Sequence, residues 1–159
     1  MNIIIFIVGV LVAYLGMLVG VGVSHYTRRE LKVGRPYFVG LQRALVVMFL
    51  LVPLLFSLEY GIVLLIALLL LAAFLIKAID HLAYVLFAIL LPYSSVNVVF
   101  FCTMVYLAFL FGIPSGSLYA EKRKIGLKAN ILNAARKYAY FPILTIVVGI
   151  LFSAISFAP

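Results

Sequence analysis

Acidic residues are scarce in this chain: Asp and Glu together number 4, against 12 Lys and Arg, and charged residues make up only 10% of the 159 positions. Soluble domains carry about 25% charged residues. Hydrophobic residues reach 68%, which is more apolar surface than a small soluble protein can keep from water, because its ratio of surface to volume is high. The composition therefore excludes an ordinary soluble domain and predicts an integral membrane protein.

Cysteine chemistry and the common catalytic motifs are also missing. Cys102 is the single cysteine and lies in an apolar run, so one chain has neither a disulfide framework nor a cysteine metal site. The sequence has no HExxH, no GxSxG, no P-loop and no cluster of aspartates. We therefore expect no metal, no cofactor and no catalytic residue, and an enzyme is the less favoured class.

The basic residues lie in or beside alternate gaps between long apolar runs. Cytoplasmic loops of membrane proteins carry the excess of Lys and Arg, so this pattern places all twelve on the inner side. The net charge of +8 then points to anionic lipid headgroups, at about 1 kcal/mol per basic residue, and not to nucleic acid. The candidate headgroup contacts are Arg28, Arg29, Arg35, Arg43, Lys122, Arg123 and Lys124.

Long apolar runs predict an all-α membrane protein, a single domain over residues 1–159 with about six transmembrane helices. A span needs about 20 apolar residues to cross about 30 Å of hydrocarbon. The expected spans are residues 3–24, 38–58, 62–76, 82–95, 97–113 and 140–158. Two basic loops, 25–37 (broken by Gly34 and Pro36) and 114–139, are expected inside, and both termini outside. The second half of the later loop has the spacing of a short helix lying on the inner headgroups.

The fourth expected span, 82–95, is short. About 14 helical residues reach only about 21 Å, so the segment is either a short crossing helix or a re-entrant one. A re-entrant segment would move the basic loop after Ile113 to the outer side. The distribution of basic residues therefore favours crossing.

Lys77, Asp80 and His81 form the candidate polar cluster. Lys77 and Asp80 are three residues apart and can pair across one helical turn, and histidine is the side chain that exchanges a proton near neutral pH. The cluster lies at a span boundary, where side chains can reach water. A structural role is therefore favoured over a proton relay or a catalytic one.

Two further sets of residues are singled out. Gly16 and Gly20 have the small-xxx-small spacing that lets another helix approach closely, so a packing role is expected. The outer side holds a set of polar positions that could line a pore if the protein transports a solute. They are Glu59, Tyr93, Ser94, Ser95 and Asn97.

The stretch from His25 to Phe38 resembles a segment of small archaeal integral membrane proteins. Those proteins share an acidic-Leu-Lys-x-Gly-basic pattern ending in Tyr-Phe, here Glu30 to Arg35 followed by Tyr37 and Phe38. The resemblance implies a prokaryotic cell membrane. It transfers no site residue, because no activity is assigned to that pattern.

The sequence is compatible with three classes of function. A non-enzymatic accessory protein or subunit of a membrane assembly, with a membrane protein partner or a homo-oligomer, is favoured by the small size and the glycine-rich first span. A small transporter or channel would use the outer polar positions, together with the Lys77–Asp80 pair, along a pore. A lipid-directed enzyme at the inner leaflet would use His25, Asp80 and His81.

Overall fold

The computed structural model describes residues 2–56, 79–121 and 126–156. Helices make up 94% of this part of the chain, and it contains no strand. Four helical segments in it are long and apolar enough to cross a membrane. Those segments are Ile3–Tyr26, Val33–Pro53, Val98–Glu121 and Leu127–Phe152, with His81–Ser94 as a shorter apolar helix. The described part of the chain is thus all-helical, and the chain has the composition of an integral membrane protein.

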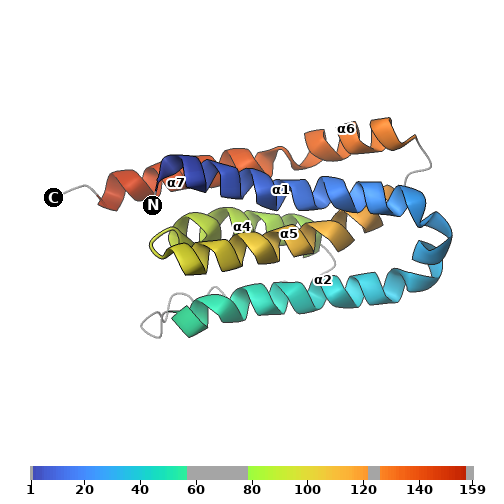
Figure 1. Cartoon of the computed structure of the whole chain (residues 1–159), viewed down its shortest axis with the longest axis horizontal. Coiled ribbons are helices and arrows are strands. Elements are labelled where there is room, and N and C mark those ends of the chain that lie inside the picture. Colours follow the sequence, from blue (N-terminus) through green and yellow to red (C-terminus); the bar gives the residue numbers. More distant parts are fainter. Residues whose placement is uncertain (1, 57–78, 122–125, 157–159) are drawn as a thin grey trace.

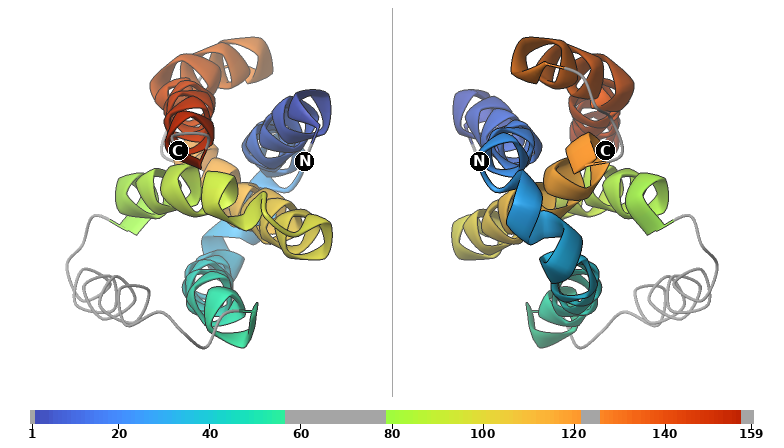
Figure 2. Two further views of the ribbon diagram at one scale, coloured as in Figure 1. Left: turned by 90° about the vertical axis from the view of Figure 1, so that its left-hand side faces the viewer. Right: turned by 90° about the vertical axis from the view of Figure 1, so that its right-hand side faces the viewer.

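The described helices form a bundle with a simple pattern of directions (Figure 1). Their bounds are α1 Ile3–Tyr26, α2 Arg28–Phe56, α4 Ile79–Ser94, α5 Val98–Glu121, α6 Leu127–Tyr138 and α7 Tyr140–Ser156. α1 and α5 run in one direction, whereas α2, α4 and α7 run in the opposite one (Figure 1). The two views in Figure 2 show α5 lying between α1 on one side and α2 on the other.

The two ends of the bundle differ in charge. The start of α1, the end of α7 and the turn between α4 and α5 share one end, which we call the terminal end (Figure 1). The α1–α2 junction and α6 lie at the other end, which we call the basic end because it holds residues 28–35 and 128–137. Charge is therefore segregated along the axis of the bundle.

The closest helix pair is α1 with α5, and glycine makes it possible. A Cβ atom added at Gly16 would overlap the Phe109 carbonyl oxygen and lie 2.8 Å from the Phe109 Cα, and one at Gly20 would meet Ile113 in the same way. Gly112 fits equally tightly against α1, because its Cβ would lie 2.5 Å from the Met17 nitrogen. We call this contact the glycine seam, formed by Gly16, Gly20, Gly112 and Gly116.

Helix α2 begins earlier than the sequence indicated, so the expected loop over 25–37 is wrong. The Thr27 hydroxyl and amide both donate to the Val23 carbonyl at the end of α1, at 2.9 and 3.0 Å, and the Thr27 carbonyl accepts from Leu31 to begin α2. Good helix formers follow Thr27, and the helix continues through Pro36, although this residue lacks a donor and its ring crowds the carbonyl four residues earlier. The chain still reverses here, but through helical residues at the basic end (Figure 1).

The later loop, expected over 114–139, is also mostly helical. α5 continues through Pro114 to Glu121, and α6 occupies Leu127–Tyr138 as the spacing indicated. Pro114 leaves one carbonyl of the preceding turn without its usual donor, which a membrane helix tolerates when neighbours supply other partners. The expected span 62–76 lies outside the described residues.

Substituting a glycine of the seam tests its importance. We expect Gly16→Ala to lower the free energy of unfolding by about 1–3 kcal/mol, the usual cost of overpacking, because the new methyl group meets the backbone of α5. Gly22→Ala is the matched control on the same helix, since a Cβ there meets nothing within 4 Å. Unfolding by SDS titration in mixed micelles measures both. Equal midpoints for the two variants would contradict the tight seam.

Candidate functional site

An aromatic cluster surrounds His81 near the basic end. We call it the His81 cluster, and it contains His81, Tyr84, Tyr119, Lys137, Tyr138 and Tyr140. These residues come from α4, α5, α6 and α7, so the cluster joins four helices that are distant in sequence. It contains one of the polar residues that the sequence singled out.

His81 lies beside two tyrosine rings, whose own centroids are 6.3 Å apart. Its imidazole stacks on Tyr138 at 5.5 Å between ring centroids and 17° between planes, and on Tyr140 at 5.9 Å and 29°. Its Nδ1 is 3.0 Å from the Tyr140 hydroxyl. His81 is exposed whereas Tyr138 is only 1% exposed. The imidazole is therefore accessible at the surface, and its contacts with the two rings restrict its orientation.

The break between α6 and α7 positions these two rings. Tyr138 ends α6 and Tyr140 begins α7, with Ala139 between them. Pro142 has no N–H to donate to the carbonyl four residues earlier, which is that of Tyr138, and its ring crowds that carbonyl. The helix is therefore interrupted at Ala139, and the tyrosines on either side of the break both face His81.

Lys137 and Tyr84 extend the cluster toward the surface and toward the core. The Lys137 ammonium lies 5.1 Å from the centre of the Tyr119 ring and 5.0 Å from that of Tyr138, within the range of a cation–π contact. Tyr84 is fully buried and contacts Tyr138 at 5.1 Å and Phe111 at 5.5 Å. Amphipathic aromatic rings of this kind anchor membrane proteins at the headgroup level.

The other expected members of the polar cluster are not brought to this site. Lys77 lies outside the described part of the chain, as does the side chain of Asp80, whose backbone is in the first turn of α4. The expected Lys77–Asp80 pair therefore stays a prediction.

The expected outer polar positions close the turn between α4 and α5. The Ser94 hydroxyl donates to the Leu91 carbonyl at 2.7 Å, and the Ser95 amide donates to the Pro92 carbonyl at 3.1 Å. The Asn97 side chain accepts from the Val99 amide at 2.9 Å, which caps the start of α5.

Tyr93 packs near this turn, with its ring edge-on to Phe100 and Phe152. Tyr93, Ser94, Ser95 and Asn97 therefore have structural contacts within the chain. Glu59 is not among the residues that the structure describes.

Two candidate headgroup contacts are described with their side chains, Arg35 and Arg43, and both are exposed. The Arg35 Nε lies 3.9 Å from the Glu121 Oε2, a distance that allows ionic attraction without a hydrogen bond, and exposed pairs of this kind add at most about 1 kcal/mol. Arg28 and Arg29 lie in α2 without described side chains, and Lys122, Arg123 and Lys124 fall outside the described residues.

Hydrogen bonds between helices are the feature that the sequence did not indicate. Gln42 on α2 donates to the Ser115 hydroxyl on α5 at 2.9 Å, and both side chains are buried. Ser117 on α5 donates to the Gly20 carbonyl at 2.9 Å across the glycine seam. Tyr14 on α1 donates to the carbonyl of Ala135 on α6 at 2.7 Å. Gly112 and Gly116 repeat the small-xxx-small spacing of α1, and that repeat was a usable signal.

Within the described residues, no three His, Cys, Asp or Glu side chains gather in a way that could hold a metal ion. Comparisons of the chain with protein-family models, with curated proteins and with solved structures find no match.

The contact between His81 and Tyr140 can be tested directly. We expect Tyr140→Phe to shift the ring nitrogen signals of His81 in ¹⁵N NMR of histidine-labelled protein, because the hydroxyl next to Nδ1 is removed. The stability cost should not exceed about 1 kcal/mol, the usual net value of one hydrogen bond. His25 is the internal control, since its ring contact is with Tyr26. An unchanged His81 spectrum would contradict the contact.

Proposed function

We propose that the chain is an integral membrane protein with six spans, both termini outside and the basic end in the cytoplasm. The charge segregation supports this orientation, because none of the described basic residues lies at the terminal end. The common direction of α2 and α4 agrees with a further crossing between them (Figure 1). The resemblance of residues 25–38 supports a prokaryotic cell membrane as the location, with anionic lipids around the basic end.

We infer that the protein acts as a non-enzymatic subunit of a membrane assembly. The observation that carries this inference is the character of the described interior: its buried polar residues are all uncharged. Proton relays and ion pathways in membranes are built from ionisable residues facing the interior. Here, three hydrogen bonds join the helices to one another instead, from Tyr14, Gln42 and Ser117. Such an interior suits a rigid protein whose role is to pack against other proteins in the membrane.

A second candidate is a lipid-directed enzyme, which the geometry at His81 favours over a transporter. An exposed imidazole with a tyrosine hydroxyl 3.0 Å from its Nδ1 can take part in proton transfer. The transporter hypothesis has less support, because the described outer polar positions form a turn and a helix cap.

The proposed orientation is testable with single cysteines in a Cys102→Ser background. Val96 at the terminal end is 87% exposed and Tyr26 at the basic end is 83% exposed, so both positions can react with a reagent in water. We expect Val96→Cys to react with a membrane-impermeant maleimide in intact cells. Tyr26→Cys should react only after the membrane is permeabilised.

Each variant is the control for the other, because both are labelled with the same reagent and the two positions have similar exposed fractions. The opposite labelling pattern would place the termini inside. Labelling of both positions in intact cells would contradict an odd number of crossings between them.

The subunit function is tested by isolating the protein in lipid nanodiscs and measuring the intact mass. We expect the chain to carry a stoichiometric protein partner, either another protein or a second copy. His81→Ala should leave this composition unchanged, since the cluster lies outside the proposed role. A lone chain that carries a specific lipid, and whose turnover of that lipid is lost in His81→Ala, would overturn the proposal in favour of the enzyme.

A further inference from the structure

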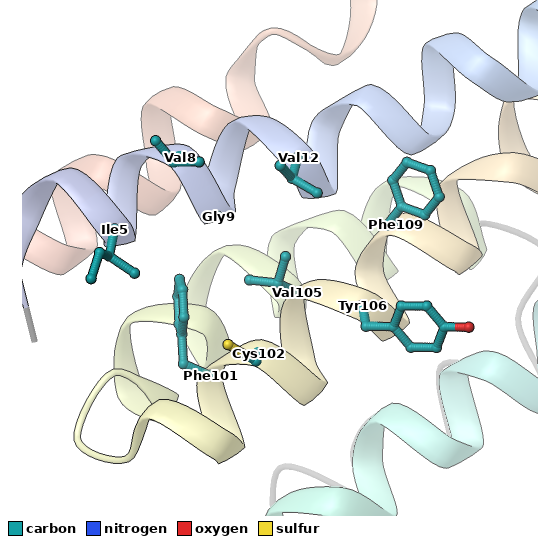
Figure 3. Close-up of a pocket in the computed structure, with 9 residues that line it drawn as sticks. All are labelled: Ile5, Val8, Gly9, Val12, Phe101, Cys102, Val105, Tyr106 and Phe109. Atoms are coloured by element: carbon teal, nitrogen blue, oxygen red, sulfur yellow. The ribbon is translucent and has the colours of Figure 1, made fainter.

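The exposed lateral surface of α1 and α5 has an open apolar groove of about 430 Å³ (Figure 3). Its floor includes Gly9, and its sides include Val8 and Val12 of α1 and Cys102 and Tyr106 of α5. The groove lies on the side of the glycine seam toward the terminal end, because Gly9 precedes Gly16 along α1 and a Cβ at Gly9 would meet the ring of Phe101. In Figure 3 the side chains of α1 and α5 border it from opposite sides.

Tyr106 is the unusual residue of this surface. It is 61% exposed, and none of the hydrogen bonds of the described chain involves its hydroxyl. It follows Asn97, the cap of α5, by nine residues, which places it about 14 Å along the helix. With the cap of α5 at the edge of a hydrocarbon layer about 30 Å thick, as the proposed orientation implies, this position is close to the centre. Tyrosines of membrane proteins normally lie at the interfaces, where the hydroxyl reaches water.

Lipid is a poor cover for this surface. Acyl chains have no hydrogen-bond acceptor, so a tyrosine hydroxyl that faces them loses its partners in water without replacement. A protein helix can supply the partner, and polar side chains do join membrane helices in this way. The groove provides space for the side chains of such a helix next to Tyr106.

We propose that the occupant is a second copy of this chain, packed about a two-fold axis that passes close to Tyr106. The proposal rests on the proposed orientation, because a common orientation makes two copies parallel and the axis perpendicular to the membrane. Each residue near that axis then meets its own counterpart at the same depth. A tyrosine hydroxyl both donates and accepts, so Tyr106 of one copy can donate to Tyr106 of the other and form one hydrogen bond between the copies. Two-fold dimers are also the commonest oligomers.

The single cysteine of the chain gives a direct test. Cys102 is exposed and lies one helical turn from Tyr106 on the same surface. We expect copper phenanthroline and oxygen to join the Cys102 thiols of two copies in proteoliposomes. The two thiols lose two protons and two electrons to oxygen, and a disulfide-linked dimer forms. Cys102→Ser should abolish this product.

A matched control reports random collision between copies in the bilayer. Val147 is 47% exposed on α7, and its depth is similar to that of Cys102, because both Gly149 and Phe101 pack against Phe6. We expect Val147→Cys in the Cys102→Ser background to form much less dimer than the wild type. Equal cross-linking at the two positions would overturn the proposed surface.

Tyr106→Phe tests the hydroxyl alone. We expect dimerisation to weaken about three-fold on dilution into lipid, the effect of losing one interhelical hydrogen bond of average strength. The monomer should stay as stable as the wild type, because no hydrogen bond within the described chain is lost. Single-molecule photobleaching in liposomes measures the dimer fraction, and an unchanged fraction would overturn the role of Tyr106.

The remaining outcomes separate this inference from the proposed function. A cross-link from Cys102 to a different protein would overturn the second copy but leave the subunit function standing. A monomer in nanodiscs with only lipid in the groove, and with no other protein bound, would overturn both.

Discussion

The contact on which the rest of this bundle depends is the approach of two backbones, those of α1 and α5. Between membrane helices there is no hydrophobic gain, because lipid is as apolar as leucine, and close packing must supply the attraction. Gly16 and Gly112 remove the side chains that would hold the helices apart. At that separation the Ser117 hydroxyl reaches the Gly20 carbonyl. α2 then packs on the outer side of α5 and is linked to it by Gln42 and Ser115.

Polarity is distributed along the bundle in two different ways. Inside, the described polar side chains are neutral, and several of them bond across helix pairs, as Tyr14 does with Ala135. At the basic end, charged and aromatic residues mix, and Lys137 lies over two tyrosine rings. Neutral groups can be satisfied by one partner in hydrocarbon, whereas a charge requires water or a counter-charge. The same physical constraint therefore explains both the uncharged interior and the crowded basic end.

The sequence was informative wherever one helix could be considered alone. Composition predicted an all-helical membrane protein, and the spacing of Gly16 and Gly20 indicated a packing face. Pro36 and Pro114 led to the incorrect loop predictions, because in a soluble protein each would favour the end of a helix. Both lie inside helices here. A loop that begins at Pro114 also placed Gly116 outside the expected helix, so its spacing with Gly112 was missed. The partners of His81 could not be predicted, since Tyr140 is 59 residues away and meets it only after four helices pack.

The parallel packing of α1 and α5 has a consequence for biosynthesis. The donor of the seam, Ser117, is made 97 residues after its acceptor, Gly20. At about 5–20 residues per second, the ribosome needs about 5–20 s to cover that distance. During this interval α1 is already long enough to span the membrane, yet its glycine strip has no neighbour from its own chain. A nascent chain that stops before α5 thus leaves the bare backbone of this strip without its partner helix, and the seam can form only after α5 has been made.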